Sequence, residues 1–217
     1  MRNKTFWFPV ILISFTVICW TFALATEAQT VQEPSVKKGN GNAESNFQKA
    51  HEFFLKKDFK IAASEIRKGA DFMKKEAESA TEEGKKVLAA SVHELEKLAT
   101  DVEKGAVKSE KELKDTFARA NNALARHHYL KASEQWAKKE TKSTGNALKN
   151  AAQHLEQAAK WSGHKLEAGS SEVVKGARAV ADKLIQGTKW VAEEVSKGIK
   201  DMGNEISKLG KQIEPKK

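Results

Sequence analysis

The spacing of the apolar residues is the feature that most constrains this 217-residue chain. From Ser45 nearly to the end, apolar positions recur at intervals of three and four residues, and the alternation that forms half-buried strands is missing. Ala, Lys and Glu are abundant, whereas the chain has only 3 Pro and 1 Tyr. Ala, Lys and Glu lose little rotamer freedom in a helix. The chain after its N-terminal segment is therefore predicted to be all-α.

The first 25 residues have the pattern of a secretory signal peptide. Arg2 and Lys4 form a short basic start, residues 5–22 are uncharged and mostly apolar, and small residues occupy positions 23 and 25. We expect cleavage after Ala25 and release of the mature chain into a bacterial periplasm. The alternative is an N-terminal membrane anchor, because the apolar run approaches the ~20 residues that span a bilayer.

Removal of residues 1–25 would leave a basic chain without cysteine. Arg2 and Lys4 are the only charged residues of this segment, so 36 Lys and Arg would remain against 29 Asp and Glu, a net charge of +7. Cys19, the single cysteine, would also be removed. A mature chain of this kind has no disulfide, no thiol nucleophile and no thiolate metal ligand.

Breaks in the apolar pattern divide the rest of the chain into four parts. Residues 26–44 contain a Gly-Asn-Gly-Asn run and almost no large apolar side chain, which is typical of a flexible linker. Residues 45–126 are predicted to form a first helical repeat and residues 127–163 a second helical hairpin. Residues 164–217 are predicted to form a long amphipathic helix with a basic tail.

An internal repeat with a spacing of 82 residues relates the two hairpins. Its clearest element is a turn, in which Lys56-Lys57-Asp58 matches Lys138-Lys139-Glu140. Chance alignment of two Lys- and Ala-rich helices is the alternative, but the shared turn favours duplication of a hairpin. The other matched pairs are Phe47 and Tyr129, Ala50 and Ala132, Glu52 and Glu134, Phe54 and Trp136, Lys60 and Lys142, Ile66 and Leu148, Ala70 and Ala152, Met73 and Leu155, and Ala77 and Ala159.

The first copy of this hairpin resembles a tetratricopeptide repeat. Phe59, Ala62, Ile66 and Gly69 stand near the large and small packing positions of that family. The family's terminal Pro is missing, and the second copy has Thr144 where a packing Ala belongs. The resemblance implies a similar way of packing two helices, and does not imply membership of the family.

From Gly176 onwards, the apolar residues follow an eleven-residue pattern. Eleven residues in three turns give 3.67 residues per turn, close to a straight α-helix, so the apolar positions form a stripe that scarcely drifts around the axis. We treat this stripe as a candidate membrane-binding or partner-binding surface. Its members are Val180, Leu184, Val191, Val195, Ile199, Met202 and Ile206.

Two interpretations of the stripe stay open. It can pack along the preceding hairpins, or it can lie on a membrane surface. Gly176, Gly187 and Gly198 weaken a helix in water and would be tolerated where a lipid surface induces the helix. In period and Lys content the segment resembles the eleven-residue lipid-binding repeats of synucleins and exchangeable apolipoproteins, and this resemblance implies an affinity for lipid.

The six histidines show no metal-binding spacing in the sequence. No two lie four residues apart, and none has Glu three residues before it as di-iron helix bundles require. A metal site would have to be assembled between helices, so we predict neither a metal ligand nor a cofactor. The histidines are His51, His93, His127, His128, His154 and His164.

No pattern in the sequence predicts catalysis. A Gly-rich phosphate loop, a nucleophile elbow and a Cys–His pair are all missing, so no catalytic residue is proposed. Nucleic acid is an unexpected partner, because the chain is predicted to be exported and has only four arginines after residue 25.

These observations lead to two hypotheses. The first is an exported, non-enzymatic helical binding or scaffold protein that associates through its amphipathic helices with a protein or with the anionic envelope surface. Self-association is compatible with it. The alternative is a periplasmic helix bundle that carries a metal or a small ligand.

Overall fold

A computed structural model describes residues 42–164 and 166–215 of the chain. These residues form seven α-helices and no strand, which confirms the all-α prediction. None of these helices is long and apolar enough to cross a membrane. The predicted signal peptide and most of the predicted linker lie outside the described residues. The helices are α1 (Ala43–Leu55), α2 (Phe59–Glu78), α3 (Glu82–Glu103), α4 (Glu110–Ala137), α5 (Thr141–Ser162), α6 (Ala168–Gln186) and α7 (Ala192–Ile213).

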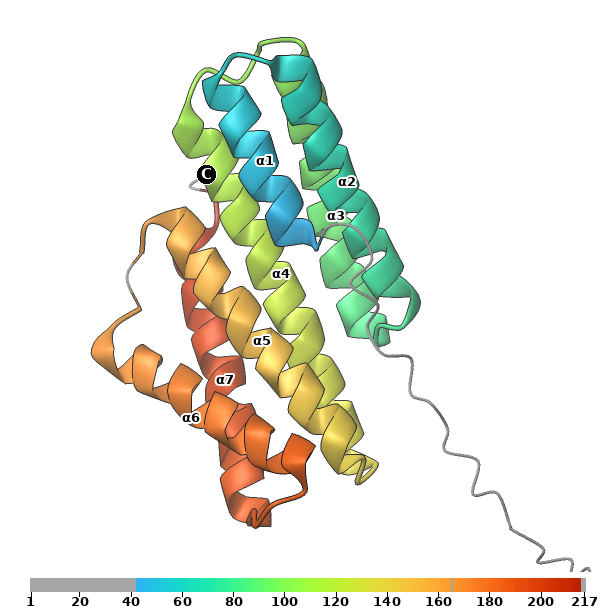
Figure 1. Ribbon diagram of the computed structural model, residues 1–217, viewed down its shortest axis with the longest axis vertical. Helices are drawn as coiled ribbons and strands as arrows, with labels where there is room; N and C mark the ends of the chain where they lie inside the picture. Colours follow the sequence, from blue (N-terminus) through green and yellow to red (C-terminus); the bar gives the residue numbers. More distant parts are fainter. Residues whose placement is uncertain (1–41, 165, 216–217) are drawn as a thin grey trace, which may run out of the picture. The chain divides into compact units, whose positions relative to one another are not determined.

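Helix α4 is shared by two groups of packed helices (Figure 1). Helices α1, α2, α3 and α4 pack against one another in chain order, and α1 also packs against α4. Helices α4, α5, α6 and α7 do the same, with α7 packed against α4. Leu113, Phe117 and Leu124 of α4 are completely buried. The division that we predicted at residue 126 falls inside this one continuous helix.

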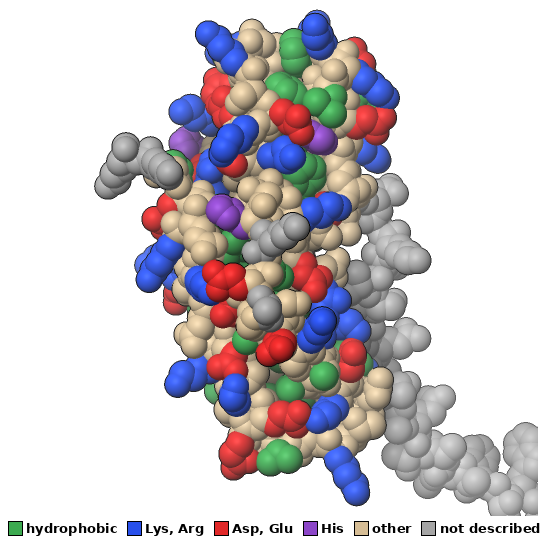
Figure 2. All heavy atoms as spheres, turned by 90° about the vertical axis from the view of Figure 1, so that its left-hand side faces the viewer, with side chains coloured by type: hydrophobic (Ala, Val, Ile, Leu, Met, Phe, Trp, Pro, Cys, Tyr) green, Lys and Arg blue, Asp and Glu red, His purple; other side chains and the backbone are tan. Residues whose placement is uncertain are grey.

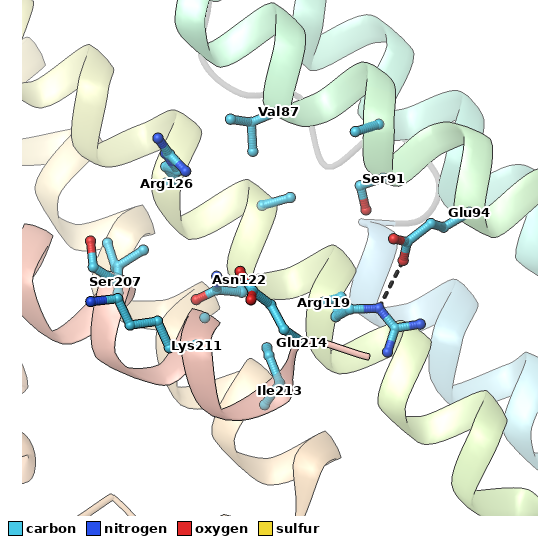
Figure 3. Close-up of a pocket in the computed structure, with 14 residues that line it drawn as sticks. Val87, Ser91, Glu94, Arg119, Asn122, Arg126, Ser207, Lys211, Ile213 and Glu214 are labelled. Atoms are coloured by element: carbon cyan, nitrogen blue, oxygen red, sulfur yellow. Dashed lines mark hydrogen bonds and ion pairs between the residues drawn. The ribbon is translucent and has the colours of Figure 1, made fainter. Parts of the chain in front are cut away.

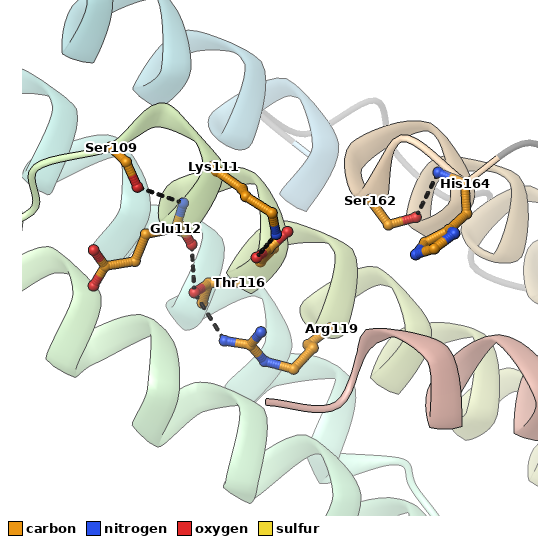
Figure 4. A network of polar contacts seen from close by, with 8 residues as sticks. Ser109, Lys111, Glu112, Thr116, Arg119, Ser162 and His164 are labelled. Carbon is orange, nitrogen blue, oxygen red and sulfur yellow. Dashed lines mark hydrogen bonds and ion pairs between the residues drawn. The ribbon is translucent and has the colours of Figure 1, made fainter. Parts of the chain in front are cut away.

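Polar side chains fix the start of α4. The hydroxyl of Ser109 accepts a hydrogen bond from the backbone N–H of Glu112 at 3.3 Å, as the Ser-x-x-Glu spacing predicts. The Thr116 hydroxyl donates to the carbonyl of Glu112 and accepts a hydrogen bond from Arg119 (Figure 4). The first two turns of α4 are thereby tied together before the helix enters the core.

Helices α1 and α4 end in the same kind of turn. At the end of α1, the backbone N–H of Asp58 donates to the carbonyl of Phe53 at 2.9 Å, and that of Lys57 donates to Phe54 at 3.0 Å. The end of α4 has the corresponding two hydrogen bonds at 2.9 and 3.0 Å. Lys57 and Lys139 therefore adopt φ angles of 64° and 61°, in the left-handed region that glycine usually occupies at this position.

Glycine at either lysine position should stabilise the fold. We expect Lys57→Gly and Lys139→Gly to raise the free energy of unfolding by roughly 0.5–1 kcal/mol, because glycine adopts positive φ without steric cost. Gly105 ends α3 with φ 66° and has open space where a Cβ would lie, so Gly105→Lys should lower stability by a similar amount. Urea unfolding followed by circular dichroism measures all three; unchanged stability in every variant would contradict strain at these turns.

Residues 164–217 form two helices, and the prediction of one long helix is wrong at Gly187. This residue adopts φ 66° and ends α6, and the backbone N–H of Thr188 donates to the carbonyl of Lys183 at 3.1 Å. The chain then reverses, so that α7 packs against α6. An eleven-residue apolar pattern is also compatible with a helical hairpin. The pattern reports which residues are apolar, and it contains no information about one residue with a left-handed backbone conformation between two helices.

Six of the seven stripe residues are buried within the helical core, and only Val191, in the α6–α7 turn, is exposed. On the face shown in Figure 2, hydrophobic side chains form small separate areas among interspersed basic and acidic ones. The burial favours the packing interpretation of the stripe. Lipid binding through these residues would require α6 and α7 to separate from the core.

Two neighbouring stripe positions provide a test of this arrangement. Val195 is 0% exposed and Val191 is 59% exposed, although both belong to the same sequence pattern. Val195→Asp should lower the free energy of unfolding by more than about 3 kcal/mol, because it buries an unpaired charge, whereas Val191→Asp should change it by less than about 0.5 kcal/mol. Denaturant unfolding of the two variants measures the difference. Equal changes in the free energy of unfolding would contradict this arrangement, because they would mean that both valines have the same environment, as they would on a continuous surface helix.

Candidate metal centre

Polar side chains meet in the core where α2, α4 and α5 come together. Helix α4 contributes His127 and His128, α5 contributes His154, and α2 contributes Glu76. The three histidines are buried, and Glu76 is partly exposed. Buried polar groups destabilise a protein unless they are hydrogen-bonded or bound to a ligand, so each of these side chains requires a partner.

Glu76, His127 and His128 form a cluster with the dimensions of a metal site. The Nε2 atom of His127 lies 3.4 Å from Oε2 of Glu76, and Nε2 of His128 lies 3.9 Å from the same oxygen. One ligand atom from each of the three residues falls within 4.8 Å of the others. The two histidine rings have centroids 4.7 Å apart and are tilted by 48°. All three side chains can therefore face a common point.

His127 is the anomaly of this cluster. Its side chain is completely buried, yet neither ring nitrogen has a hydrogen-bond partner among the described residues. Nε2 of His127 lies 3.4 Å from Oε2 of Glu76 but does not form a well-directed hydrogen bond with it. On the other side, the first turn of α3 approaches so closely that a Cβ on Gly84 would lie 3.1 Å from Nδ1 of His127. An imidazole held this way has two ring nitrogens in the core that no described residue satisfies.

His154 is held by a hydrogen-bond chain that determines its tautomer. The amide nitrogen of Asn121 donates to Oε2 of Glu44 and to the carbonyl of Phe117, both at 3.2 Å. The amide oxygen of Asn121 therefore faces His154 and accepts a hydrogen bond from its Nδ1 at 3.0 Å. In a neutral ring this leaves the lone pair on Nε2. The His154 ring stacks on His128 with a centroid distance of 5.4 Å and an angle of 9°, so it supports the cluster from behind.

Glu44 is the acceptor at the end of this chain of hydrogen bonds, and it lies in a segment that we predicted to be flexible. Helix α1 begins at Ala43, so the end of the predicted linker, residues 26–44, is helical and buried. The Glu44 carboxylate accepts hydrogen bonds from Asn121, from the indole N–H of Trp161 at 3.0 Å and from Gln48 at 2.9 Å. These donors offset the desolvation of a charge and join α1, α4 and α5.

Burial in the core keeps His128 and His154 neutral. Desolvation lowers the pKa of His128 well below 6.5 and lowers that of His154 to about 4. The polar contact with His127 lowers the pKa of the Glu76 carboxyl despite the opposing effect of burial. At neutral pH, Glu76 is therefore a carboxylate and His128 an uncharged imidazole, which are the protonation states that bind metal ions.

Zinc dimensions fit this donor set. With metal–nitrogen and metal–oxygen distances of about 2.0–2.2 Å, two ligands on a tetrahedral ion lie roughly 3.3–3.5 Å apart. The 3.4 Å separation of His127 and Glu76 matches this value, and the 3.9 Å separation of His128 and Glu76 requires a small side-chain movement. Three protein ligands would leave one coordination position open for water or another donor.

The spacing of residues in the sequence did not reveal this cluster, because Glu76 lies 51 residues before His127 and on another helix. One signal was available. The apolar residues of α4 continue through Leu113, Phe117 and Leu124 at helical intervals, so the same inward face includes positions 127 and 128. The predicted stripe residues take no part in the cluster.

Comparisons with protein-family models, with curated proteins and with solved structures find no match to this chain.

A groove between α3, α4 and α7 is the other candidate site (Figure 3). It has a volume of about 330 Å³, and its lining mixes apolar side chains with polar ones and with charged ones of both signs, which are Glu94, Arg119, Arg126, Lys211 and Glu214. The hydroxyl of Ser91 and the amide oxygen of Asn122 are buried there without a hydrogen-bond partner. However, Glu94 accepts a hydrogen bond from Arg119 at 2.8 Å, so that cation is already neutralised. The histidine cluster is the more specific chemical feature.

The lowered histidine pKa values predict how metal-free protein responds to acid. An unfolded chain takes up a proton on His154 near pH 6.5, whereas the folded chain does so only near pH 4, so stability is lost as the pH falls through this range. Burial also lowers the pKa of His128, which therefore acts in the same direction. For His154, the difference between 6.5 and about 4 corresponds to roughly 3 kcal/mol. The pKa of the Glu76 carboxyl is lowered from 4.5, chiefly by its contact with His127.

His154→Gln should therefore flatten the pH dependence of stability between pH 7 and pH 4.5. Urea unfolding of metal-free wild type and variant at several pH values measures it. His93→Ala, at an exposed position of α3, is the control and should leave the slope unchanged. Parallel curves for wild type and His154→Gln would show that this ring is not held neutral by the core.

Proposed function

We propose that this chain is a non-enzymatic helical protein that binds a divalent transition-metal ion through Glu76, His127 and His128. The observation that carries the proposal is the environment of His127. Its ring is completely buried with both nitrogens unpaired, and a carboxylate oxygen lies 3.4 Å from Nε2. An unpaired buried imidazole destabilises the apo fold, and a bound ion would use the lone pair that the protein leaves free.

The chemistry of the donor atoms limits which metal ions the site can bind. Imidazole nitrogens suit zinc, copper, nickel and iron, whereas magnesium and calcium prefer sites made only of oxygen. Two histidines and one carboxylate form a common zinc ligand set with an open position. Zinc is therefore the first ion to test. Glu76 is the most exposed of the three ligands, so an ion would enter from its side of the cluster.

Zinc titration of the chain from residue 26 onwards tests the proposal. Isothermal titration calorimetry should show one site, and zinc should raise the melting temperature, because only the folded state assembles the ligands. Glu76→Gln, His127→Ala and His128→Ala should each weaken zinc binding at least tenfold. His93→Ala removes an exposed histidine on α3 and should bind zinc like the wild type.

The variants also separate ligand loss from loss of fold. Circular dichroism of each metal-free variant should retain the helical spectrum, since Glu76→Gln and His128→Ala leave α4 and its capping intact. Equal zinc affinity in all four variants would overturn the proposal. So would the lack of any saturable site in the folded wild type.

Export fits this function but rests on the sequence alone. We propose that residues 1–25 are removed and that the mature chain acts in the periplasm, where a protein without cysteine can hold zinc through histidine and carboxylate ligands. An uncleaved N-terminal anchor would place the same domain at the membrane surface. Intact-mass measurement of the exported protein distinguishes a chain that starts at Thr26 from one that starts at Met1.

Binding of a protein partner is the second candidate function. Trp190 and Val191, in the turn between α6 and α7, are exposed apolar side chains that a partner could cover.

We also propose that the α1–α2 and α4–α5 hairpins are copies of one tetratricopeptide-like unit, and that α6 and α7 are the amphipathic helices of the scaffold. The matching φ angles of Lys57 and Lys139 support this duplication.

A further inference from the structure

The turn between α1 and α2 combines exposed apolar side chains with an excess of lysines. Leu55, the last residue of α1, is 56% exposed, and Ile61, in the first turn of α2, is 45% exposed. Phe53, Phe54 and Phe59 of the same segment are partly buried and pack against the core. Leu55 and Ile61 are two of the four exposed large apolar side chains among the described residues, and they lie six positions apart on either side of one turn.

The same end of the domain is strongly basic. Residues 53–61 contain three Lys and one Asp, and the neighbouring loop, residues 104–109, contains two Lys and no acid. The acids that flank these segments, Glu52, Glu103 and Glu110, pair with Lys56, Arg67 and His51, so the charges left without an ion pair among the described residues are four Lys against one Asp, a net charge of +3. Lys57, Lys60, Lys104 and Lys108 are exposed and form no ion pair among the described residues. We refer to Leu55, Ile61 and these four lysines as the basic tip.

Two contacts bring the two segments of the basic tip to one end of the bundle. Arg67 of α2 pairs with Glu103, at the end of α3, at 2.5 Å. His51 of α1 pairs with Glu110, at the start of α4, at 2.9 Å. Figure 1 shows the α1–α2 turn and the α3–α4 connection together at the top of the view. The lysines of both segments can therefore act on the same anionic surface.

The opposite end provides a comparison. There, the turn 187–194 carries the exposed side chains of Trp190 and Val191, but the charges of residues 135–143 and 187–194 sum to only +1. Trp136 at that end is already used, because its indole N–H donates to Ser196 at 3.1 Å and its ring packs edge-on against Trp190. The two ends thus share the Lys-Lys turn, whereas the high positive charge belongs to the basic tip alone.

We infer that the basic tip docks the protein onto an anionic lipid bilayer surface, an activity that goes beyond the proposed metal binding and does not depend on it. Leu55 and Ile61 enter the boundary between head groups and acyl chains, while the lysines around them contact anionic head groups. Lys57 holds a left-handed backbone conformation without an internal ion pair, so its ammonium group is available to such a surface. Two inserted side chains make this a weak and salt-sensitive association.

The test is flotation of the metal-free chain from residue 26 onwards with lipid vesicles. Residues 1–25 are left out because their apolar run would bind lipid by itself, and the seven helices pack among themselves without them. The protein should float with vesicles that contain phosphatidylglycerol, remain unbound with pure phosphatidylcholine vesicles, and bind less as sodium chloride is raised.

Matched variants locate the contact. The double variant Leu55→Glu and Ile61→Glu should weaken vesicle binding at least tenfold, whereas Val191→Glu, at an equally exposed position of the other end, should not. Lys57→Gly should weaken it about fivefold, and Lys139→Gly, in the same turn of the other hairpin, should leave it unchanged. All five substituted positions are exposed, so circular dichroism should show the wild-type helical spectrum in each of the four variants.

Three results would overturn the inference. The first is no flotation with anionic vesicles at low salt. The second is a loss of flotation caused by Val191→Glu as large as that caused by the double variant, which would place the contact at the other end. The third is binding of soluble dextran sulfate without any binding of vesicles, which would reveal a general anion-binding surface. None of these results bears on zinc affinity, so the metal proposal stands or falls separately.

Discussion

The sharing of α4 between two groups of helices is the constraint on which the rest of this structure depends. A helix at the edge of a bundle can direct its polar residues to water, but α4 is contacted by α1, α3, α5 and α7. Asn121, His127 and His128 therefore lie in the core. Asn121 is satisfied by Glu44 and His154, whereas His127 is not satisfied by any described residue. The candidate metal centre follows from this difference.

The polar core also explains why α1 begins where it does. A carboxylate at position 44 would be costly to bury without partners, and here the side chains of Asn121, Trp161 and Gln48 all donate to it. Those donors come from three helices, so the charge of Glu44 fixes α1 against α4 and α5. Composition alone assigned this residue to a flexible linker, because the donors lie up to 117 residues away in the sequence.

Local features of the fold were predictable, and long-range ones were not. The periodicity, the Ser109 cap and the Lys-Lys turns depend on residues within one or two helical turns, and each was recognisable in the sequence. The end of α6 depends on one backbone angle at Gly187, which the apolar pattern does not encode. The metal cluster depends on how α2 is placed against α4. A search for metal-binding spacings within one helix could therefore not detect it. A buried face with two adjacent histidines was the one local sign.

The two proposed activities lie at different ends of one helix, and this separation makes them independent. Helix α2 begins beside the basic tip at Phe59 and reaches the metal cluster at Glu76. At 1.5 Å per residue, these positions are about 25 Å apart, far beyond the distance over which substitutions usually interact. The tip consists of exposed side chains whose exchange leaves the core packing intact, whereas the cluster consists of buried ones that the core holds in place. A surface contact at one end can therefore change without altering the geometry of the ligands at the other.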